Sequence, residues 1–298
     1  MGKYKKPIVS IIVPCFNQGK YILETLESVS RQTFTNFECI VVNDGSTDDS
    51  LVKMKSFCED DTRFHYIDKF NEGVSVARNT AIRQSQGKYI LPLDADDMIA
   101  ETYLEKTVAY IEEHPEVKVV CTNTRLFGAK NTDYDLPEYD YNRIICRNVL
   151  VCTALYRRKD FDKTTGYNPK MVKGLEDWDF WLTFLNEEDI VHRIDEYLFF
   201  YRMKYESRNR NSFKSYARIR RQIWENHKEI YANHFFNPVE SDEYQTLINS
   251  KEYKIGKKLS PILNMRWCYY LIGFFKRDGR KSPYRQEVRQ VLLLYHAL

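Results

Sequence analysis

The residues best suited to chemistry are three carboxylates within four positions, Asp94-Ala95-Asp96-Asp97, directly after an apolar run that begins at Tyr89. A buried strand that ends in an Asp-x-Asp cluster presents hard oxygen ligands at the edge where open α/β sheets bind ligands. This arrangement suits a divalent cation that holds a diphosphate. A polar turn with solvated carboxylates has the same appearance, so the interpretation depends on what else reaches this edge.

The elements that must position this cluster alternate along the chain. Aliphatic runs predict strands at 9–13, 37–42, 64–67, 89–93 and 117–122. Apolar residues at helical spacing predict helices at about 22–29, 74–84, 101–113 and 178–185. Such alternation predicts an α/β fold with a doubly wound, mostly parallel, Rossmann-like sheet whose site lies at the carboxyl ends of the strands.

The rest of the chain is organised differently. Residues 128–148 are polar and rich in Tyr and Asp, which predicts a long functional loop or an acceptor-side insertion. Beyond Tyr201 the sequence becomes basic and helical in pattern. We therefore expect a catalytic domain at 1–205 and a basic helical extension at 206–298.

Composition sets broad limits on the protein class. The 298 residues are 43% apolar and 29% charged, which is ordinary for a globular protein that buries a full core. Met1–Lys6 leads directly into a strand-like segment without a signal sequence, so we expect a cytoplasmic protein. Seven scattered cysteines without a Cys-x-x-Cys pair indicate reduced thiols.

Charge changes sign along the chain. Residues 1–201 carry 25 basic and 33 acidic side chains, and residues 202–298 carry 20 and 9. The aromatic run Trp267–Phe275, flanked by Lys and Arg, is too short to span a bilayer. Such a run suits a helix that lies on an anionic membrane surface. Alternatively, its aromatic side chains could dock on the catalytic domain or on the second subunit of a homodimer. Both interpretations stay open. No motif indicates a nucleic-acid partner.

Five segments in order resemble the signatures of family two glycosyltransferases. They are 9–17, 41–48, 71–79, 93–97 and 174–179. The resemblance covers roughly residues 7–205 and implies a GT-A fold and the inverting transfer of a sugar from a nucleotide diphosphate donor. The Gln-x-x-Arg-Trp signature of processive synthases is absent after Asp177, which favours the addition of a single sugar.

The resemblance assigns Pro14, Asn17, Asp44 and Arg78 to the nucleoside side of the pocket, and Asn71 with less support. Asp44 could accept a hydrogen bond from a base N–H, and the following Gly45 lets the backbone approach a ligand closely. A ligand-free Asp-Gly turn and a solvated Arg on a helix are the structural alternatives.

Within 94–97, alternation along an extended segment would direct Asp94 and Asp96 to one side. The resemblance implies that Asp94 lies near the ribose and that Asp96 holds the metal, for which Mn²⁺ and Mg²⁺ are equally suitable. Asp97 either joins the site or caps the following helix.

Asp177 is the candidate general base, because a partly desolvated carboxylate beside Trp178 has a raised pKa yet stays reactive when ionised. Glu176 would bind the acceptor or favour the helix amino terminus.

Lys204 stands where many relatives carry His in a later motif. It can neutralise a phosphate but is a poor metal ligand. A surface loop is the alternative for this segment.

The predicted function is therefore an inverting, metal-dependent hexosyl- or N-acetylhexosaminyl-transferase with a nucleotide-sugar donor, UDP-linked by default. Its expected acceptor is a lipid-linked saccharide, a precursor in envelope or capsular polysaccharide biosynthesis, met at the inner membrane face. Two alternatives are a nucleotidyltransferase and a catalytically silent nucleotide-binding membrane or assembly protein. The first lacks a Gly-rich, Lys-containing phosphate loop, and the second has no need for Asp94, Asp96 and Asp177 together.

Overall fold

The computed structural model describes residues 6–204 and 216–263. Its contacts divide the chain into two compact units, Met1–Glu240 and Ser241–Leu298. This division falls further along the chain than the boundary expected after residue 205. The reason is that α9 (Tyr216–Asn226) buries Ile219 and Ile223 in the same apolar core as helix α7 (Glu176–Phe184) of the first unit.

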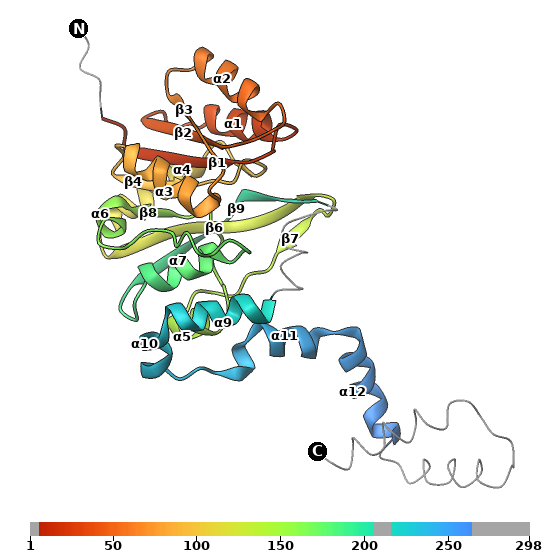
Figure 1. Cartoon of the computed structure of the whole chain (residues 1–298). Coiled ribbons are helices and arrows are strands. Elements are labelled where there is room, and N and C mark those ends of the chain that lie inside the picture. Colours follow the sequence, from red (N-terminus) through yellow and green to blue (C-terminus); the bar gives the residue numbers. More distant parts are fainter. Residues whose placement is uncertain (1–5, 205–215, 264–298) are drawn as a thin grey trace, which may run out of the picture. The chain divides into compact units, whose positions relative to one another are not determined.

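The first unit is built on a mixed sheet with strand order β3-β2-β1-β4-β8-β6-β9-β5, and β7 pairs with β6 (Figure 1). The strands are β1 Val9–Cys15, β2 Phe37–Asp44, β3 Phe64–Lys69, β4 Tyr89–Pro92, β5 Met98–Ile99, β6 Val117–Gly128, β7 Thr132–Tyr134, β8 Leu155–Arg157 and β9 Ile190–Met203. The first four strands are parallel to one another, β8 is antiparallel to both β4 and β6, and β6 is parallel to β9. The predicted α/β class is confirmed.

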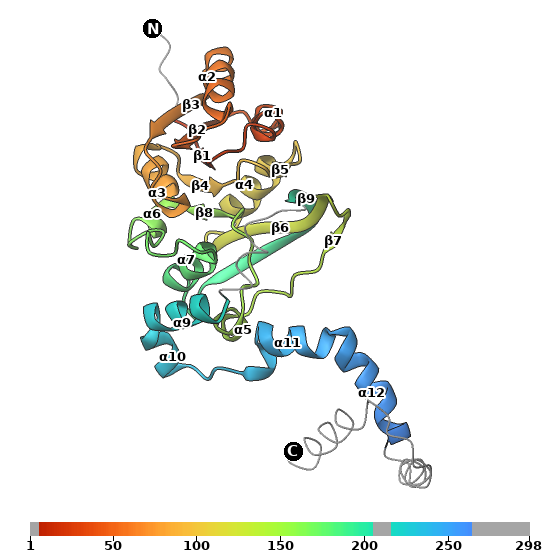
Figure 2. The same ribbon diagram turned by 45° about the vertical axis from the view of Figure 1, so that its right-hand side comes forward.

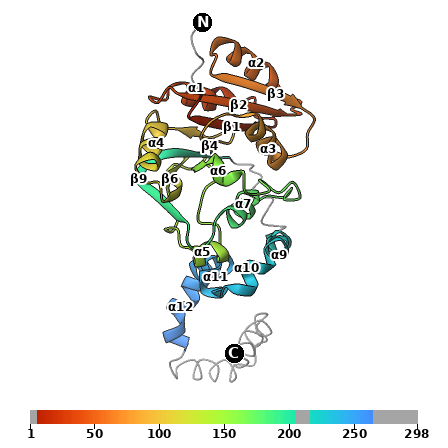
Figure 3. The ribbon, with the colours of Figure 1, turned by 90° about the vertical axis from the view of Figure 1, so that its left-hand side faces the viewer.

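Helices cover both faces of this sheet. Their bounds are α1 Ile22–Ser30, α2 Ser50–Asp60, α3 Val74–Gln84, α4 Tyr103–Glu113, α5 Tyr141–Cys146, α6 Arg158–Phe161, α10 Lys228–Asn233 and the 3₁₀ turn η1 Pro238–Glu240. Strand β1 alternates between two cores, because Ile11 and Val13 pack with α1, α2 and α4 while Ile12 packs with α3, α7 and α9. The latter three helices lie along one side of the strands in Figure 3.

The order of the strands fixes where a ligand can bind. The chain runs outward through β1, α1, β2, α2 and β3, and then α3 carries it back to β4 on the other side of β1. The carboxyl ends of β1 and β4 therefore diverge at a topological switch point, which is where open α/β sheets bind their ligands.

Two regions differ from the sequence predictions. The stretch 128–148 contains the last residue of β6, strand β7 and helix α5 rather than an unbroken loop. Strand β9 reaches Met203 beside β6, as Figure 2 shows, so the segment just beyond Tyr201 is extended before the helices begin. Pairing with β6 over its whole length overrides the weak local pattern of this strand.

The second unit begins with α11 (Asp242–Asn249) and α12 (Lys251–Leu263). Ser241 caps α11 by accepting a hydrogen bond from the Tyr244 N–H, as an N-cap serine commonly does. Within the described ranges, no helix combines the length and apolar character that a bilayer crossing requires. The aromatic run at 267–275 lies outside the described residues.

Candidate functional site

Four of the predicted site residues lie at or directly after the carboxyl ends of three neighbouring strands. Pro14 lies buried near the end of β1 and Asp44 ends β2, while Asp94 and Asp96 follow β4. Asn17, with φ of 52°, ties two of these ends together. Its Oδ1 accepts the Thr47 N–H at 2.8 Å, and its own N–H donates to Ser46 Oγ at 3.0 Å.

Asp44 is buried and held by its neighbours on the loop between β3 and α3. Its carboxylate accepts the N–H groups of Glu72 and Gly73 at 3.0 and 2.8 Å and the Lys69 ammonium at 2.8 Å. The Asn71 side chain donates to the Asp44 carbonyl oxygen at 2.8 Å. Asp44 and Asn71 therefore form one preorganised corner, and Lys69 is a neighbour that the sequence motifs did not indicate.

Glycine is required beside this corner. Gly45 has φ of 73°, and a Cβ at this position would lie 2.7 Å from the Asn71 backbone nitrogen. Any other residue would be strained and would push the loop away from Asp44.

The cluster after β4 forms a turn, so the expectation of an extended segment is wrong. The Asp97 N–H donates to the Asp94 carbonyl oxygen at 3.0 Å. As a result Asp94 and Asp96 meet different cations, Arg78 at 2.7 Å and Lys204 at 2.5 Å. Burial raises the pKa of the Asp96 carboxyl, and the Lys204 ammonium opposes this shift.

Asp97 has a structural role, although it does not cap a helix, because α4 begins after Thr102. Its carboxylate is buried and accepts the backbone N–H of Arg202 at 2.7 Å. Burial raises the pKa of the Asp97 carboxyl well above its usual range, and the neighbouring aspartates raise it further. Asp97 therefore fastens the turn to the end of β9.

Arg78 connects the two acidic parts of the site. Only 1% of its side chain is exposed, and the guanidinium donates to Asp94 Oδ1 at 2.7 Å and to Glu176 Oε1 at 3.4 Å. It also lies 5.2 Å from the centre of the Tyr167 ring. Within the described residues, the buried Arg78 Nε has no hydrogen-bond partner. The resemblance assigned Arg78 to the nucleoside side of the pocket, and this role remains a prediction. In the structure Arg78 also links Asp94 of the carboxylate cluster to Glu176 of α7.

Glu176 and Asp177 open helix α7 after two residues with positive φ, Gly174 at 113° and Leu175 at 58°. Asp177 Oδ2 accepts a hydrogen bond from Asn148 Nδ2 at 2.9 Å. Burial raises the pKa of the Asp177 carboxyl to about 6, with a further contribution from Glu176. A carboxylate with such a pKa can accept a proton near neutral pH. Asn148 was not identified individually from the sequence, where it only closes the polar stretch 128–148.

The end of β9 closes the site against α1. Lys204 Nζ lies 2.7 Å from Gln18 Oε1, and Arg202 donates to the Asp96 carbonyl oxygen at 2.7 Å and to Glu24 at 2.7 Å. The sequence placed Lys204 near the phosphates but gave no signal for Gln18, because nothing local pairs two residues this far apart.

The carboxylates after β4 fit a divalent cation that is shared with a diphosphate. Within the described parts of the chain, no group of three or more His, Cys, Asp or Glu side chains could hold a metal by itself. Mg²⁺ and Mn²⁺ at phosphate sites need only one or two carboxylates, because phosphate and water oxygens supply the remaining ligands. Asp96 would hold such an ion, and the ion would neutralise the charge of the bound phosphates.

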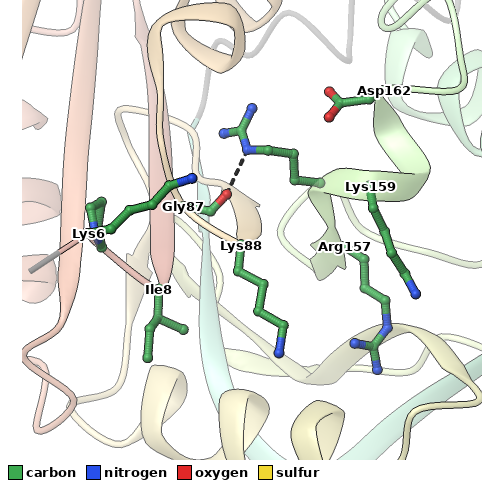
Figure 4. Close-up of a pocket in the computed structure, with 9 residues that line it drawn as sticks. Lys6, Ile8, Gly87, Lys88, Arg157, Lys159 and Asp162 are labelled. Atoms are coloured by element: carbon green, nitrogen blue, oxygen red, sulfur yellow. Dashed lines mark hydrogen bonds between the residues drawn. The ribbon is translucent and has the colours of Figure 1, made fainter.

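A separate cavity of about 640 Å³ lies at the opposite end of the sheet, before β1 and β4 (Figure 4). Five basic side chains and Asp162 take part in its lining. Arg157 donates to three backbone carbonyls and Arg158 to two, so these cations serve the fold. None of the predicted site residues lines this cavity.

Comparison with known proteins identifies the family. The model of Glycosyl transferase family 2 matches residues 10–172. The chain belongs to this family. The match spans strands β1 to β8 and includes Asp44, Asp94 and Asp96, and the family predicted from the motifs is confirmed.

Family-two relatives cover different shares of the chain. An uncharacterized glycosyltransferase of Rickettsia bellii is 44% identical over 106 residues, which are 36% of this chain and 15% of that protein. The uncharacterized glycosyltransferase EpsJ of Bacillus subtilis is 30% identical over 66% of this chain and 61% of its own length. TuaG of the same organism, named as a putative teichuronic acid biosynthesis glycosyltransferase, is 29% identical over 77% of this chain and 91% of its own.

Solved structures agree with the GT-A fold. Residues 1–349 of Staphylococcus aureus TarS, in complex with UDP-GlcNAc, align with a TM-score of 0.65 and 23% identity over 86% of this chain and 76% of that one. The mannosyltransferase PcManGT of Pyrobaculum calidifontis, in complex with GDP-Man and Mn²⁺, gives a TM-score of 0.60 and 16% identity over 95% and 83%.

Proposed function

We propose that this chain transfers a single sugar from a nucleotide diphosphate sugar to a saccharide acceptor, with inversion at the anomeric carbon. The observation that carries the proposal is the buried Arg78 bridge from Asp94 to Glu176, beside Asp177 with its pKa of about 6. This bridge links Asp94, in the carboxylate cluster of the proposed donor site, to Glu176, which is adjacent in sequence to the candidate base Asp177.

The proposed chemistry follows from these positions. Asp177, ionised and held by Asn148, takes the proton of the acceptor hydroxyl as its oxygen forms a bond to the anomeric carbon. The bond from that carbon to the diphosphate oxygen breaks on the opposite face, and its electron pair leaves with the diphosphate. The Lys204 ammonium and the Arg202 guanidinium, both beside Asp96, stabilise the negative charge that develops on the departing diphosphate.

We propose a UDP-linked donor first and a GDP-linked donor second. The solved structure of TarS contains UDP-GlcNAc and that of PcManGT contains GDP-Man, and the Asp44 corner offers a carboxylate to the N–H of a base. Thermal stabilisation of the purified chain by UDP-, GDP- and dTDP-sugars with Mn²⁺ tests the choice, because a ligand that prefers the folded state raises its apparent stability. A chain that none of these donors stabilises would contradict the proposal.

We further propose a lipid-linked envelope or capsular glycan as the acceptor, met at the inner membrane face. TuaG is named as a putative teichuronic acid biosynthesis glycosyltransferase, and α12 carries Lys251, Lys254, Lys257 and Lys258 beside the exposed Tyr253. Co-sedimentation of the full chain with anionic and with neutral vesicles tests this placement. Equal binding to both would show that the lysine charge has no role, and binding to neither would favour docking on protein instead.

The rate of sugar transfer should fall on the acid side of pH 6, because one carboxyl group becomes protonated there. Asp177 must be ionised to accept a proton, and burial raises its pKa to about 6, so its active fraction falls as the pH drops below that value. We expect kcat/KM to rise tenfold per pH unit below about 6 and to level off above it. A profile of kcat/KM from pH 4.5 to 8.5 measures this, and a flat profile across pH 6 would rule out Asp177 as the base.

Asp96→Ala should abolish metal-dependent donor binding. The substitution removes the carboxylate that would hold the cation against the diphosphate, and the affinity for UDP with Mn²⁺ should fall to the value measured in EDTA. Isothermal titration of UDP with and without Mn²⁺ measures the difference. Glu196→Ala, an exposed carboxylate paired with Lys106, is the matched control. A persisting Mn²⁺ effect in Asp96→Ala would place the metal elsewhere.

A further inference from the structure

Lys204 joins three segments of the proposed donor site. Its ammonium lies 2.5 Å from Asp96 Oδ2, 2.7 Å from Gln18 Oε1 and 4.5 Å from the centre of the Tyr21 ring. The side chains of Lys204 and Asp96 are only 18% and 24% exposed. The carboxylate that would hold the metal is therefore already neutralised by a cation of the protein itself.

An ammonium and a divalent cation on one carboxylate repel each other. Partial burial lowers the effective dielectric constant and strengthens this repulsion relative to water. Arg202 adds to it, because its guanidinium donates to the Asp96 carbonyl oxygen. A nucleotide diphosphate changes this balance, since its oxygens can accept hydrogen bonds from Lys204 and neutralise both cations.

We propose that Lys204 couples metal binding to diphosphate binding at this site. Without nucleotide, its ammonium occupies Asp96 and opposes the metal. With nucleotide, the flexible lysine stem lets the ammonium turn to the phosphate oxygens and leaves Asp96 to the metal. The inference rests on the proposed function and adds to it an ordered, cooperative assembly of metal and donor. By reciprocity, the metal strengthens nucleotide binding by the same factor.

A matched control lies elsewhere in the same unit. Lys118 Nζ lies 2.7 Å from Asp189 Oδ2, donates to the Phe184 carbonyl oxygen and sits 4.7 Å from the Phe184 ring centre. Its side chain is 16% exposed, close to the value for Lys204. Lys118→Met therefore removes a similar ammonium from a similar carboxylate and aromatic ring at a place without a proposed role.

The test is a titration of the full chain with Mn²⁺, followed by the electron paramagnetic resonance signal of free Mn²⁺, without nucleotide and with saturating UDP. For the parent chain we expect UDP to raise the Mn²⁺ affinity by at least about tenfold. Lys204→Met should bind Mn²⁺ more tightly without nucleotide, and the factor by which UDP raises the affinity should be at least about threefold smaller than for the parent chain. Lys204→Arg keeps the charge and should keep most of the coupling. Lys118→Met should match the parent.

Two results would overturn the inference. One is an unchanged coupling factor in Lys204→Met, and the other is a parent chain that binds Mn²⁺ equally well with and without UDP. Failure of the proposed function gives a different result, because a parent chain that binds neither UDP nor GDP, with or without Mn²⁺, would have no nucleotide site to couple. Thermal melts of each variant establish that it is folded.

Discussion

Asp177→Asn is expected to lower kcat by at least about a hundredfold and to leave the affinity for the donor within about twofold of the parent. The amide keeps the size of the side chain and can still meet Asn148, but it cannot accept the acceptor proton. Within the described residues, Asp177 forms no hydrogen bond or ion pair with Asp44, Asp94 or Asp96, so the donor corner should be undisturbed. Single-turnover transfer and donor titration measure the two quantities separately.

Asp179→Asn is the control for this substitution. Asp179 lies on the same helix and is buried, but it accepts hydrogen bonds from Asn226 and His227 rather than facing Arg78. Its replacement should affect stability more than the chemical step. If Asp177→Asn transferred sugar at the parental rate, the assignment of the base would be wrong.

Arg78→Met is expected to reduce both transfer and stability. The guanidinium is 1% exposed and separates two carboxylates, and removing one partner of a buried ion pair typically costs about 3–5 kcal/mol. Asp94 is 36% exposed, so we expect the lower end of this range, about 3 kcal/mol. Urea denaturation gives the free energy of unfolding.

Arg125→Met is the comparison for stability, because Arg125 and Asp133 form an ion pair in which both side chains are 50% exposed. Its loss should cost less than about 1 kcal/mol. Arg78→Lys tests geometry apart from charge, since a lysine cannot reach both carboxylates as a planar fork does. If Arg78→Met had the stability and activity of the parent, the contacts of Arg78 with Asp94 and Glu176 would contribute to neither property.

The fold was predictable where the pattern is local. Apolar spacing located α3 at residues 74–84 and the aliphatic run located β1, because one buried face repeats every few residues. Strand β9 was not predicted, because most of its residues are half-exposed and lack a clear apolar pattern. Its position depends on pairing with β6, which is far away in the sequence. The short elements inside 128–148 escaped for a similar reason, since the Asp140 cap of α5 sits in a stretch dominated by polar residues.

The candidate site was predictable in composition but not in contacts. Motif spacing identified Asp44, Asp96 and Asp177 as candidates, and their roles remain predictions. The Arg78–Glu176 bridge joins residues 98 positions apart, and no local pattern encodes such a pair. The turn at 94–97 was misjudged because alternation applies only to extended backbone, whereas Asp97 bends this segment towards β9. Long-range hydrogen bonds decide these features.

The most direct test of sugar transfer is the release of nucleoside diphosphate from UDP-, GDP- and dTDP-sugars with Mn²⁺, by the parent chain and by Asp177→Asn. We predict that the parent turns over one donor class, and that Asp177→Asn binds the same donor equally well but turns it over at least about a hundredfold more slowly. No release from any of these donors, or equal rates for parent and variant, would contradict this prediction.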